Sequence, residues 1–266
     1  YMKVLVINLD SATTRMAFQN EQLNQLGLEY ERLPAIQIKD KTHEYFVNYH
    51  ATWQRPLSLA EVACFFSHKM AWDKVIEADS PMLILEDDAF LVENVTSLLA
   101  ELNKLKDVDY VNLEARGINK KKQLAKKATY CFGESEMIRL FQGRSGAAGY
   151  VIWPSGVKKL LVKMENEGIA ISDKFINSAC NLLAYQIEPA VIIQLDQCTL
   201  YGITQPIEVQ TSLGTRPPSA SIYSTMFWRH TFKRIVGQLK IGFNQMRNSH
   251  RATLRNITIS ELFKKL

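Results

Sequence analysis

Apolar runs and amphipathic stretches alternate along the first third of the chain. Residues 3–10 are β-branched and apolar, which is typical of a buried strand, and residues 11–27 have apolar positions at helical spacing. A serine or threonine is expected to cap this helix and Gly27 to end it. A second apolar segment, residues 30–36, predicts another strand. This strand, helix and strand predict a βαβ unit and therefore a parallel sheet.

The next clear helix is predicted over residues 58–79. Ser58 stands at its N-cap and Glu61 follows three residues later, as in a capping box, and an apolar stripe continues from there. Residues 37–56 show no clear period and are expected to form a loop or short helices. The remaining pattern predicts strands at residues 82–88, 109–115 and 145–154, and a last pair of strands within 184–194. Helices are predicted at 93–106, 155–168 and 172–184, and a solvated loop or hairpin at the lysine-rich residues 120–127.

These elements predict an α/β protein with a mostly parallel central sheet, divided into three parts. Residues 1–199 hold the alternating strands and helices, residues 200–225 suggest a linker or mobile loop, and residues 226–266 form a basic helical tail. The formal net charge of the chain is +5. The tail contains nine Lys or Arg residues against one acid, a net charge of +8, which leaves −3 for the rest of the chain.

The tail has apolar residues at helical spacing, with basic residues between them. Such a helix is expected to lie flat on an anionic membrane surface, apolar side down. The alternative is a helix that packs onto the rest of the protein or onto a second subunit. No run reaches transmembrane length and no leader peptide is expected, so this membrane contact would be peripheral. Four cysteines at wide spacings suggest neither a zinc site nor disulfides and fit a cytoplasmic location best.

Three adjacent carboxylates, Glu86, Asp87 and Asp88, end the apolar run that begins at residue 82. Because side chains alternate along a strand, Glu86 and Asp88 are expected to point one way and Asp87 the other. Carboxylate oxygens are ligands that Mg²⁺ or Mn²⁺ prefer, so the pair is a candidate site for a hard cation. The alternative is a cluster of acids exposed to solvent in a turn.

Six segments of the sequence resemble one family in their order and spacing. They are INLD at residues 7–10, SLAEVACFFSHKMAW at 58–72, LILEDD at 83–88, VNLEA at 111–115, SGAAGYVIWPSGVKKLL at 145–161 and ISDKFI at 171–176. Together they resemble glycosyltransferase family 25, in particular the bacterial branch that extends lipopolysaccharide or lipooligosaccharide outer cores, often as galactosyltransferases. The resemblance covers residues 4–197. Ala60 and Ala147 depart from the family pattern, which puts the donor-sugar and acceptor preference in question.

The resemblance implies a GT-A architecture, which is a nucleotide-sugar-binding α/β fold in which an Asp-x-Asp-like motif holds Mn²⁺ or Mg²⁺. Glu86 and Asp88 would hold the ion, directly or through water, and Gln194 or Asp196 is the candidate third ligand. The ion would neutralise the diphosphate that leaves when the sugar is transferred.

The resemblance also places Asp173 as the base that takes the proton of the acceptor hydroxyl in an inverting transfer. The alternative is that Ser172 or Asp173 merely caps a helix. Glu114 is the second catalytic candidate, and we expect it to bind a sugar hydroxyl unless it is only an acid at the end of a strand.

Donor-binding candidates lie at the ends of the first strands and on the capping-box helix. In an open α/β sheet, a nucleotide binds beyond the carboxyl ends of the strands. Glycines are expected where a sugar approaches the backbone, with tight packing as the alternative. For His68 the alternative is a hydrogen-bonded core residue, and for Glu61 it is completion of the cap. The candidates are Asn8, Asp10, Arg15, Ala35, Glu61, Ser67, His68, Asp87, Gly146 and Gly149, with Tyr150 and Trp153 as possible aromatic faces for a sugar.

The sequence therefore predicts a metal-dependent, inverting glycosyltransferase that uses a UDP-sugar, with UDP-galactose as the first candidate, to extend a lipopolysaccharide or lipooligosaccharide core. Such an enzyme would lie on the inner face of the inner membrane. A metal-dependent nucleotidyl or phosphoryl transferase is an alternative, although no phosphate-loop motif is present. A nucleic-acid-binding protein that uses the basic tail is another. Binding of nucleic acid is not expected, because the acidic body would repel phosphate.

Overall fold

The computed structural model describes residues 2–38, 42–118, 120–143, 146–208 and 224–265. The strands are β1 (Lys3–Asn8), β2 (Tyr30–Pro34), β3 (Met82–Glu86), β4 (Ala89–Leu91), β5 (Tyr110–Asn112), β6 (Lys122–Ala125), β7 (Tyr130–Phe132), β8 (Ser135–Gln142), β9 (Gly149–Ile152), β10 (Ala184–Glu188), β11 (Ile192–Gln194) and β12 (Ala252–Arg255). The helices are α1 (Thr13–Gln25), α2 (Thr42–Tyr49), α3 (Leu59–Ala78), α4 (Val95–Leu102), α5 (Pro154–Glu167), α6 (Ser172–Asn177) and α7 (Thr225–Asn248), with 3₁₀ turns η1 (Leu195–Gln197), η2 (Thr199–Tyr201) and η3 (Glu261–Lys264).

Within the described residues, ten strands form one sheet in the order β12-β6-β8-β10-β5-β9-β3-β1-β2, with β7 paired to β8. From β2 to β10, five of the six strands run in the same direction, and β9 is antiparallel to both of its neighbours. This part confirms the α/β class with a mostly parallel central sheet. The strands beyond β10 extend the sheet with antiparallel pairs. A second, two-stranded sheet joins β4 to β11.

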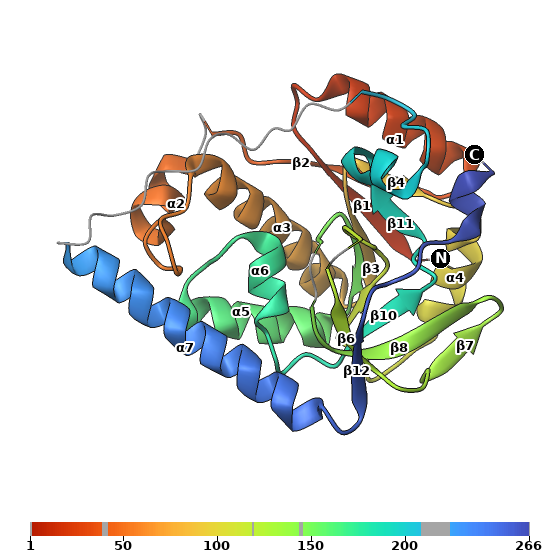
Figure 1. The fold of residues 1–266 in the computed structure, drawn as a ribbon. Helices are drawn as coiled ribbons and strands as arrows, with labels where there is room; N and C mark the ends of the chain where they lie inside the picture. The colour runs from red at the N-terminus through yellow and green to blue at the C-terminus, as the bar shows by residue number, and fades with distance from the viewer. Residues whose placement is uncertain (1, 39–41, 119, 144–145, 209–223, 266) are drawn as a thin grey trace.

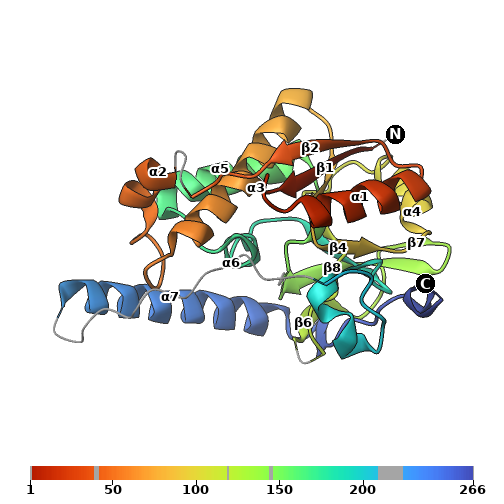
Figure 2. The ribbon, with the colours of Figure 1, turned by 90° about the horizontal axis from the view of Figure 1, so that it is seen from above.

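Alternating side chains give the sheet two apolar faces. Leu5 and Ile84 contribute to the core that α3, α5 and α6 cover, whereas Val4 and Leu85 contribute to the core that α1 and α4 cover. Figures 1 and 2 show these two groups of helices on opposite sides of the sheet. The central strands β1, β3 and β9 are buried on both faces, which explains why they read as continuous apolar runs.

The predicted capping box of α3 is confirmed. Ser58 Oγ accepts from the backbone N–H of Glu61 (3.2 Å), and the Glu61 carboxylate accepts from the backbone N–H of Ser58 (3.0 Å). The predicted cap of α1 is wrong, because its N-cap residue is Ala12 and no side chain caps it. The side-chain amide of Asn8 instead donates to the carbonyl of Ala12 (3.1 Å) and holds the turn that leads into α1.

Two other predictions of local structure differ from the structure. Residues 120–127 were expected to form a solvated loop or hairpin, and Lys120, Lys121, Lys126 and Lys127 are exposed. Residues 122–125, however, form β6, in which Lys122 is 1% exposed. Its ammonium group donates to the carbonyl of Glu114 (3.1 Å) and to Gln186 Oε1 (2.6 Å), so polar partners replace water. The helix predicted over 172–184 ends at Asn177, where turns lead to β10.

The C-terminal region is not purely helical, because the strand β12 and the turn η3 follow α7. Residues 200–225 were predicted to be a linker, and most of them, 209–223, lie outside the described residues. α7 then runs along one side of the molecule, as Figures 1 and 2 show. After α7 the chain returns to the sheet, because β12 pairs antiparallel with β6. None of the described helices is both long and apolar enough to span a membrane.

Candidate active site

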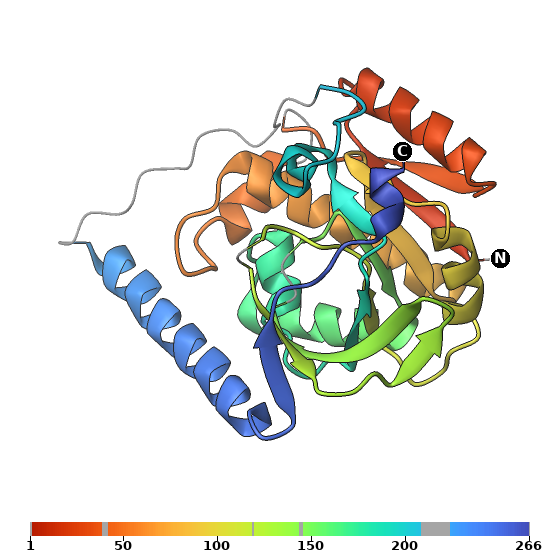
Figure 3. The same cartoon turned by 45° about the vertical axis from the view of Figure 1, so that its right-hand side comes forward.

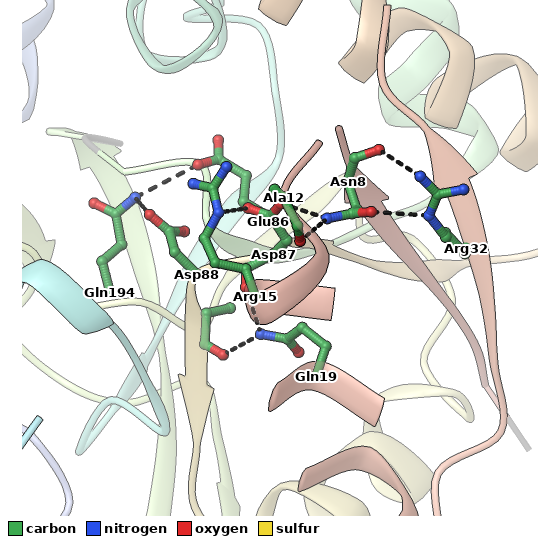
Figure 4. A network of polar contacts seen from close by, with 10 residues as sticks. Asn8, Ala12, Arg15, Gln19, Arg32, Glu86, Asp87, Asp88 and Gln194 are labelled. Atoms are coloured by element: carbon green, nitrogen blue, oxygen red, sulfur yellow. Dashed lines mark hydrogen bonds and ion pairs between the residues drawn. The ribbon is translucent and has the colours of Figure 1, made fainter. Parts of the chain in front are cut away.

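The acid cluster lies where β3 ends and the short strand β4 begins (Figure 4). β4 pairs with β11 in a register that sets Ala89 opposite Gln194, and this brings Gln194 beside the cluster. Gln194 Nε2 lies 3.5 Å from Glu86 Oε2 and 3.4 Å from Asp88 Oδ2. Gln194 therefore converges with Glu86 and Asp88, although it lies more than 100 positions after them in the chain. Asp196, the other candidate for a third ligand, is exposed in η1.

Some buried oxygen atoms in this region lack hydrogen-bond partners among the described residues, although Gln194 turns its amide nitrogen, and not its oxygen, toward the two carboxylates (Figure 4). In the part of the chain that the structure describes, Asp88 Oδ1, Gln194 Oε1 and Glu114 Oε1 are buried and accept no hydrogen bond. Burial, and then the charges of Glu86 and other nearby acids, raise the pKa of Asp88 well above its ordinary value. A divalent cation would supply the missing partner and remove the repulsion. The oxygen ligands present therefore fit Mg²⁺ or Mn²⁺.

Asp87 points the other way, as predicted, although it lies in the turn after β3, and it connects the cluster to β1 and α1 (Figure 4). Its Oδ2 accepts from Asn8 Nδ2 (2.7 Å), and its Oδ1 lies 3.4 Å from Arg15 Nε. Asn8 Oδ1 in turn accepts from Arg32 Nε (2.8 Å). Arg32 also forms an ion pair with Asp10 (2.5 Å). The structure thus brings Asn8, Asp10, Arg15 and Asp87 together at the end of β1, where they were expected.

His68 is buried and contacts the carboxylate of Glu86. It is 1% exposed, its Nε2 lies 3.1 Å from Glu86 Oε1, and its Nδ1 lies 3.0 Å from the hydroxyl of Tyr150. Burial alone would lower the pKa of His68, but contacts with Tyr150, Cys64 and Glu86 raise it well above its ordinary value. The same contact holds the pKa of Glu86 below its ordinary value against the effect of burial. His68 therefore acts on the site through Glu86.

Cys64 stands one turn before His68 and was not considered a ligand from the sequence. One ligand atom from each of Cys64, His68 and Glu86 lies within 4.8 Å of the others, a spacing that could hold a metal ion. Both ring nitrogens of His68 already have polar neighbours, however. Asp88 Oδ1, by contrast, is buried and has no hydrogen-bond partner among the described residues, so we consider the Asp88 carboxylate the better cation site.

Glu114 is fully buried beside the cluster. Its Oε2 accepts from the backbone N–H of Ala148 (2.9 Å), and burial raises its pKa to about 8. Gly146 has a φ of +90°, and a Cβ at this position would overlap the Glu114 carboxylate. A glycine is therefore required for the carboxylate to sit where it does. At Gly149 an added Cβ would overlap Ile192, so packing between strands accounts for that glycine.

Arg116 is a component that sequence reasoning missed. Burial would lower the pKa of Arg116, but the charges of Glu114, Glu86, Asp173 and Asp196 together raise it. Arg116 thus stands among acids that come from four separate segments. No sequence motif marks it, although its position two residues after Glu114 could have drawn attention to it.

Asp173 belongs to this neighbourhood, because its charge acts on Arg116. It lies in the first turn of α6, its side chain is 14% exposed, and it is 3.4 Å from the ammonium group of Lys174. The N-cap of α6 is Ile171. Neither Ser172 nor Asp173 therefore caps the helix, which was the alternative to a catalytic role for Asp173.

Other candidates are engaged in the scaffold. Glu61 forms an ion pair with Arg55 (2.5 Å) besides completing its capping box. Ser67 Oγ accepts from the backbone N–H of Ile36 (2.9 Å), and the N–H of Ala35 donates to the carbonyl of Asn8 (2.9 Å), so both fix the chain after β2. Tyr150 and Trp153 are both buried, at 0% and 6% exposure, which contradicts the idea that one of them offers a ring to a sugar.

Several known proteins and one protein family are similar to this chain in sequence. Residues 2–176 match the family described as "Glycosyltransferase family 25 (LPS biosynthesis protein)". The lipooligosaccharide biosynthesis protein lic2B of Haemophilus influenzae is 28% identical over 72% of this chain and 76% of its own length. A putative glycosyltransferase of the same species is 26% identical over 71% and 69%. A glycosyltransferase 25 family member of Anopheles gambiae is 26% identical over 59% of this chain but only 28% of its own length.

Among solved structures, a glycosyltransferase involved in glycosylation of the major capsid of PBCV-1 covers 73% of this chain and 93% of its own, at 10% identity and a TM-score of 0.38. The family match spans well over half of the sequence and includes the acid cluster, Glu114 and Asp173. The chain belongs to glycosyltransferase family 25.

Proposed function

We propose that the protein is a metal-dependent, inverting glycosyltransferase that moves a sugar from a UDP-sugar to a hydroxyl group of a lipopolysaccharide or lipooligosaccharide core. Galactose is the first candidate for that sugar. The observation that carries the proposal is the convergence of Glu86, Asp88 and Gln194, where Asp88 Oδ1 is buried and has no hydrogen-bond partner among the described residues. The name of the Haemophilus relative supports the class of acceptor.

The donor would lie at the carboxyl ends of β1 and β3, with its diphosphate beside Glu86 and Asp88. These two residues would hold Mn²⁺ or Mg²⁺, and Gln194 would join them with its side-chain amide turned so that Oε1 faces the ion. When bound, the ion neutralises charge on the leaving diphosphate. Asn8, Arg15 and Asp87 keep the turn after β3 in place through the contacts described above. His68 orients Glu86.

Asp173 is the proposed base. As the acceptor oxygen attacks the anomeric carbon, its proton passes to the Asp173 carboxylate, and the bond between the anomeric carbon and the diphosphate oxygen breaks. The electron pair of that bond leaves with the diphosphate, and the configuration inverts. Glu114, whose pKa is about 8, keeps its proton at neutral pH and can donate a hydrogen bond to a sugar hydroxyl.

α7 supports the proposal that the enzyme works on the inner face of the inner membrane. Along one side of this helix, separated by three or four residues, lie large apolar side chains that are 54% to 73% exposed: Trp228, Phe232, Ile235, Leu239, Phe243 and Met246. The opposite side contacts the protein through polar groups. His230 Nδ1 donates to the carbonyl of Trp53 (2.7 Å), and Asn244 Nδ2 donates to that of Phe141 (2.9 Å).

A helix that packs on its own protein normally turns its apolar side inward. α7 does the reverse, and its basic residues flank the outward apolar stripe. An anionic bilayer matches both properties. The acceptor proposed for the enzyme is anchored in such a bilayer.

A screen of UDP-sugars tests the proposal. Thermal unfolding is followed with UDP-galactose, UDP-glucose and UDP-N-acetylglucosamine, each with Mn²⁺ or with EDTA, and GDP-mannose serves as the control nucleotide sugar. A ligand present at about 100 times its Kd adds about 2.7 kcal/mol to the free energy of unfolding. We expect one UDP-sugar, UDP-galactose first, to raise the melting temperature only with Mn²⁺. Equal shifts with EDTA would contradict the metal dependence.

A further inference from the structure

A small cavity of about 180 Å³ lies beside the C-terminal half of α7, where the helix passes β8 and the turn after α6. Three arginines line it: Arg139 from β8, Arg247 from α7 and Arg251 from the turn that leads to β12. None of the described residues that line it is acidic. Figure 3 shows how α7 and β12 meet in this region.

Two of the arginines are fixed by neutral partners. Arg139 donates to the carbonyls of Leu182 (3.1 Å) and Ala184. Arg251 donates to Asn248 Oδ1 through Nε (3.0 Å) and Nη2 (2.6 Å). Their guanidinium carbons lie 5.4 Å and 4.7 Å from the ring centre of Phe141. These neutral partners orient both guanidinium groups without forming an ion pair with either of them.

Ion pairs are present elsewhere around this helix. Lys159 pairs with Asp109 (2.5 Å), and Lys163 and Lys240 both pair with Glu167 (2.5 and 3.3 Å). By contrast, in the described part of the chain none of the three arginines has a carboxylate oxygen within 4.0 Å. Burial, with a smaller effect of the charge of Arg251, holds the pKa of Arg139 below its ordinary value against the opposing effects of Tyr185 and Asp109. Bringing these like charges together costs free energy, and an anion in the cavity would offset that cost.

We propose that this cavity binds the phosphate group of a phosphate ester. Guanidinium groups bind phosphate through paired N–H donors, and a site with several arginines and no acid selects an anion with several oxygens. A larger cavity of about 440 Å³ adjoins the first and shares Asn244 and Arg247 with it. Phe243 and Val162, which are 68% and 55% exposed, help to line this second cavity. It provides room for the organic part of the ester.

Phosphate esters of two origins have this chemistry. One is the headgroup of an anionic phospholipid, which the apolar stripe of α7 would bring close. The other is a phosphate carried by a glycan or by a small molecule in solution. The site is separate from the acid cluster and does not depend on the identity of the sugar donor.

Arg247→Gln is the variant that tests the site. Arg247 is exposed, and its side chain forms no hydrogen bond with the other described residues on which the fold depends. Arg234→Gln is the matched control: it removes the same charge from the same helix, and Arg234 is exposed but lines neither cavity. Glycerol 3-phosphate binding is measured by calorimetry at constant ionic strength. Flotation with vesicles of phosphatidylcholine, alone or mixed equally with phosphatidylglycerol, is the second measurement.

We expect Arg247→Gln to weaken binding of glycerol 3-phosphate, of phosphatidylglycerol vesicles, or of both by about tenfold, the effect of losing one charge-assisted contact. Arg234→Gln should stay within about twofold of the unsubstituted protein. A difference only with glycerol 3-phosphate identifies a soluble or glycan phosphate, and a difference with vesicles identifies a lipid headgroup. Equal behaviour of the two variants in both measurements would overturn the proposal. Thermal unfolding of both variants shows whether Arg247 merely stabilises the end of α7.

Discussion

The acid cluster after β3 and the basic helix α7 are the two strongly charged regions of the molecule, and they are built in opposite ways. At the cluster, charged groups are buried and held by long-range contacts, such as those from Asn8 and Gln194. On α7, the polar side faces the protein and the apolar side faces outward. The cluster therefore has the properties of a site that binds one ligand in a fixed geometry, whereas α7 has those of a docking surface.

The two regions also respond differently to change. A substitution at the cluster removes a group that many neighbours position, so a large loss of activity is expected. A substitution on the outer side of α7 removes contact area only, so its effect should be graded and should appear on a membrane and not in solution. The following predictions test this contrast.

Asp173→Asn is expected to have the largest effect. Loss of the base should slow sugar transfer by about 10²- to 10⁴-fold. Donor affinity should stay unchanged, because the amide has the same size and Asp173 is not among the groups that hold the diphosphate. Steady-state kinetics and calorimetry with the donor separate the two quantities. Asp196→Asn is the matched control, since Asp196 also acts on Arg116 but is exposed. Turnover like that of the unsubstituted enzyme would disqualify Asp173.

Phe232→Ser combined with Leu239→Ser should weaken binding to anionic vesicles by about tenfold to a hundredfold, because each side chain loses apolar burial in the bilayer. Activity on a soluble acceptor should not change. Vesicle flotation provides the measurement. Gln238→Ser combined with Gln245→Ser alters the flank of the same helix and should have little effect. If both double variants bind vesicles equally, α7 covers another surface, such as a second copy of the chain.

Gly146→Ala should destabilise the protein by about 1–3 kcal/mol more than Gly133→Ala. Both glycines have positive φ, but a Cβ at Gly133 meets open space and one at Gly146 overlaps the Glu114 carboxylate. Urea unfolding measures the difference. Equal destabilisation would show that backbone conformation alone, and not the carboxylate, requires Gly146.

The metal-free protein should lose stability as pH rises from about 5 to about 8, by on the order of 1 kcal/mol per pH unit. The folded-state pKa of Glu114 is about 8, above its ordinary value of 4.5, and that of Asp88 is raised in the same direction. Both groups therefore stabilise the fold at low pH and stop doing so as pH rises through their folded-state pKa values. Saturating Mn²⁺ should reduce the slope, and so should Glu114→Gln. Urea unfolding that gives rising stability over this range would contradict the assignment.

Much of the acid cluster could be predicted because its geometry is local. Asp87 and Asp88 lie in the turn after β3 and not in the strand, yet their side chains still point apart as alternation predicted, and the capping box of α3 depends only on Ser58 and Glu61. Gln194 could be predicted as one of two candidates for a third metal ligand, because it stands at the end of the last apolar strand.

Other features depend on contacts between distant segments. Lys122 lies in a run of lysines that predicts exposure to solvent. Its strand, β6, nevertheless pairs with β8, and the Lys122 side chain donates to Gln186. β12 is short, and only its pairing with β6 makes it a strand. Arg116 is marked by four acids that no sequence window contains together. The outward direction of the apolar stripe of α7 likewise follows from contacts with residues such as Trp53, far away in the chain.

Calorimetric titration of Mn²⁺ and UDP into Asp88→Asn tests the central claim most directly. Asp73→Asn, which removes an exposed carboxylate from α3, is the control. We predict that the unsubstituted protein and Asp73→Asn bind UDP only when Mn²⁺ is present, and that Asp88→Asn shows no binding that depends on Mn²⁺. Binding of UDP and Mn²⁺ to Asp88→Asn with unchanged affinity would contradict the assignment of the acid cluster as the metal site.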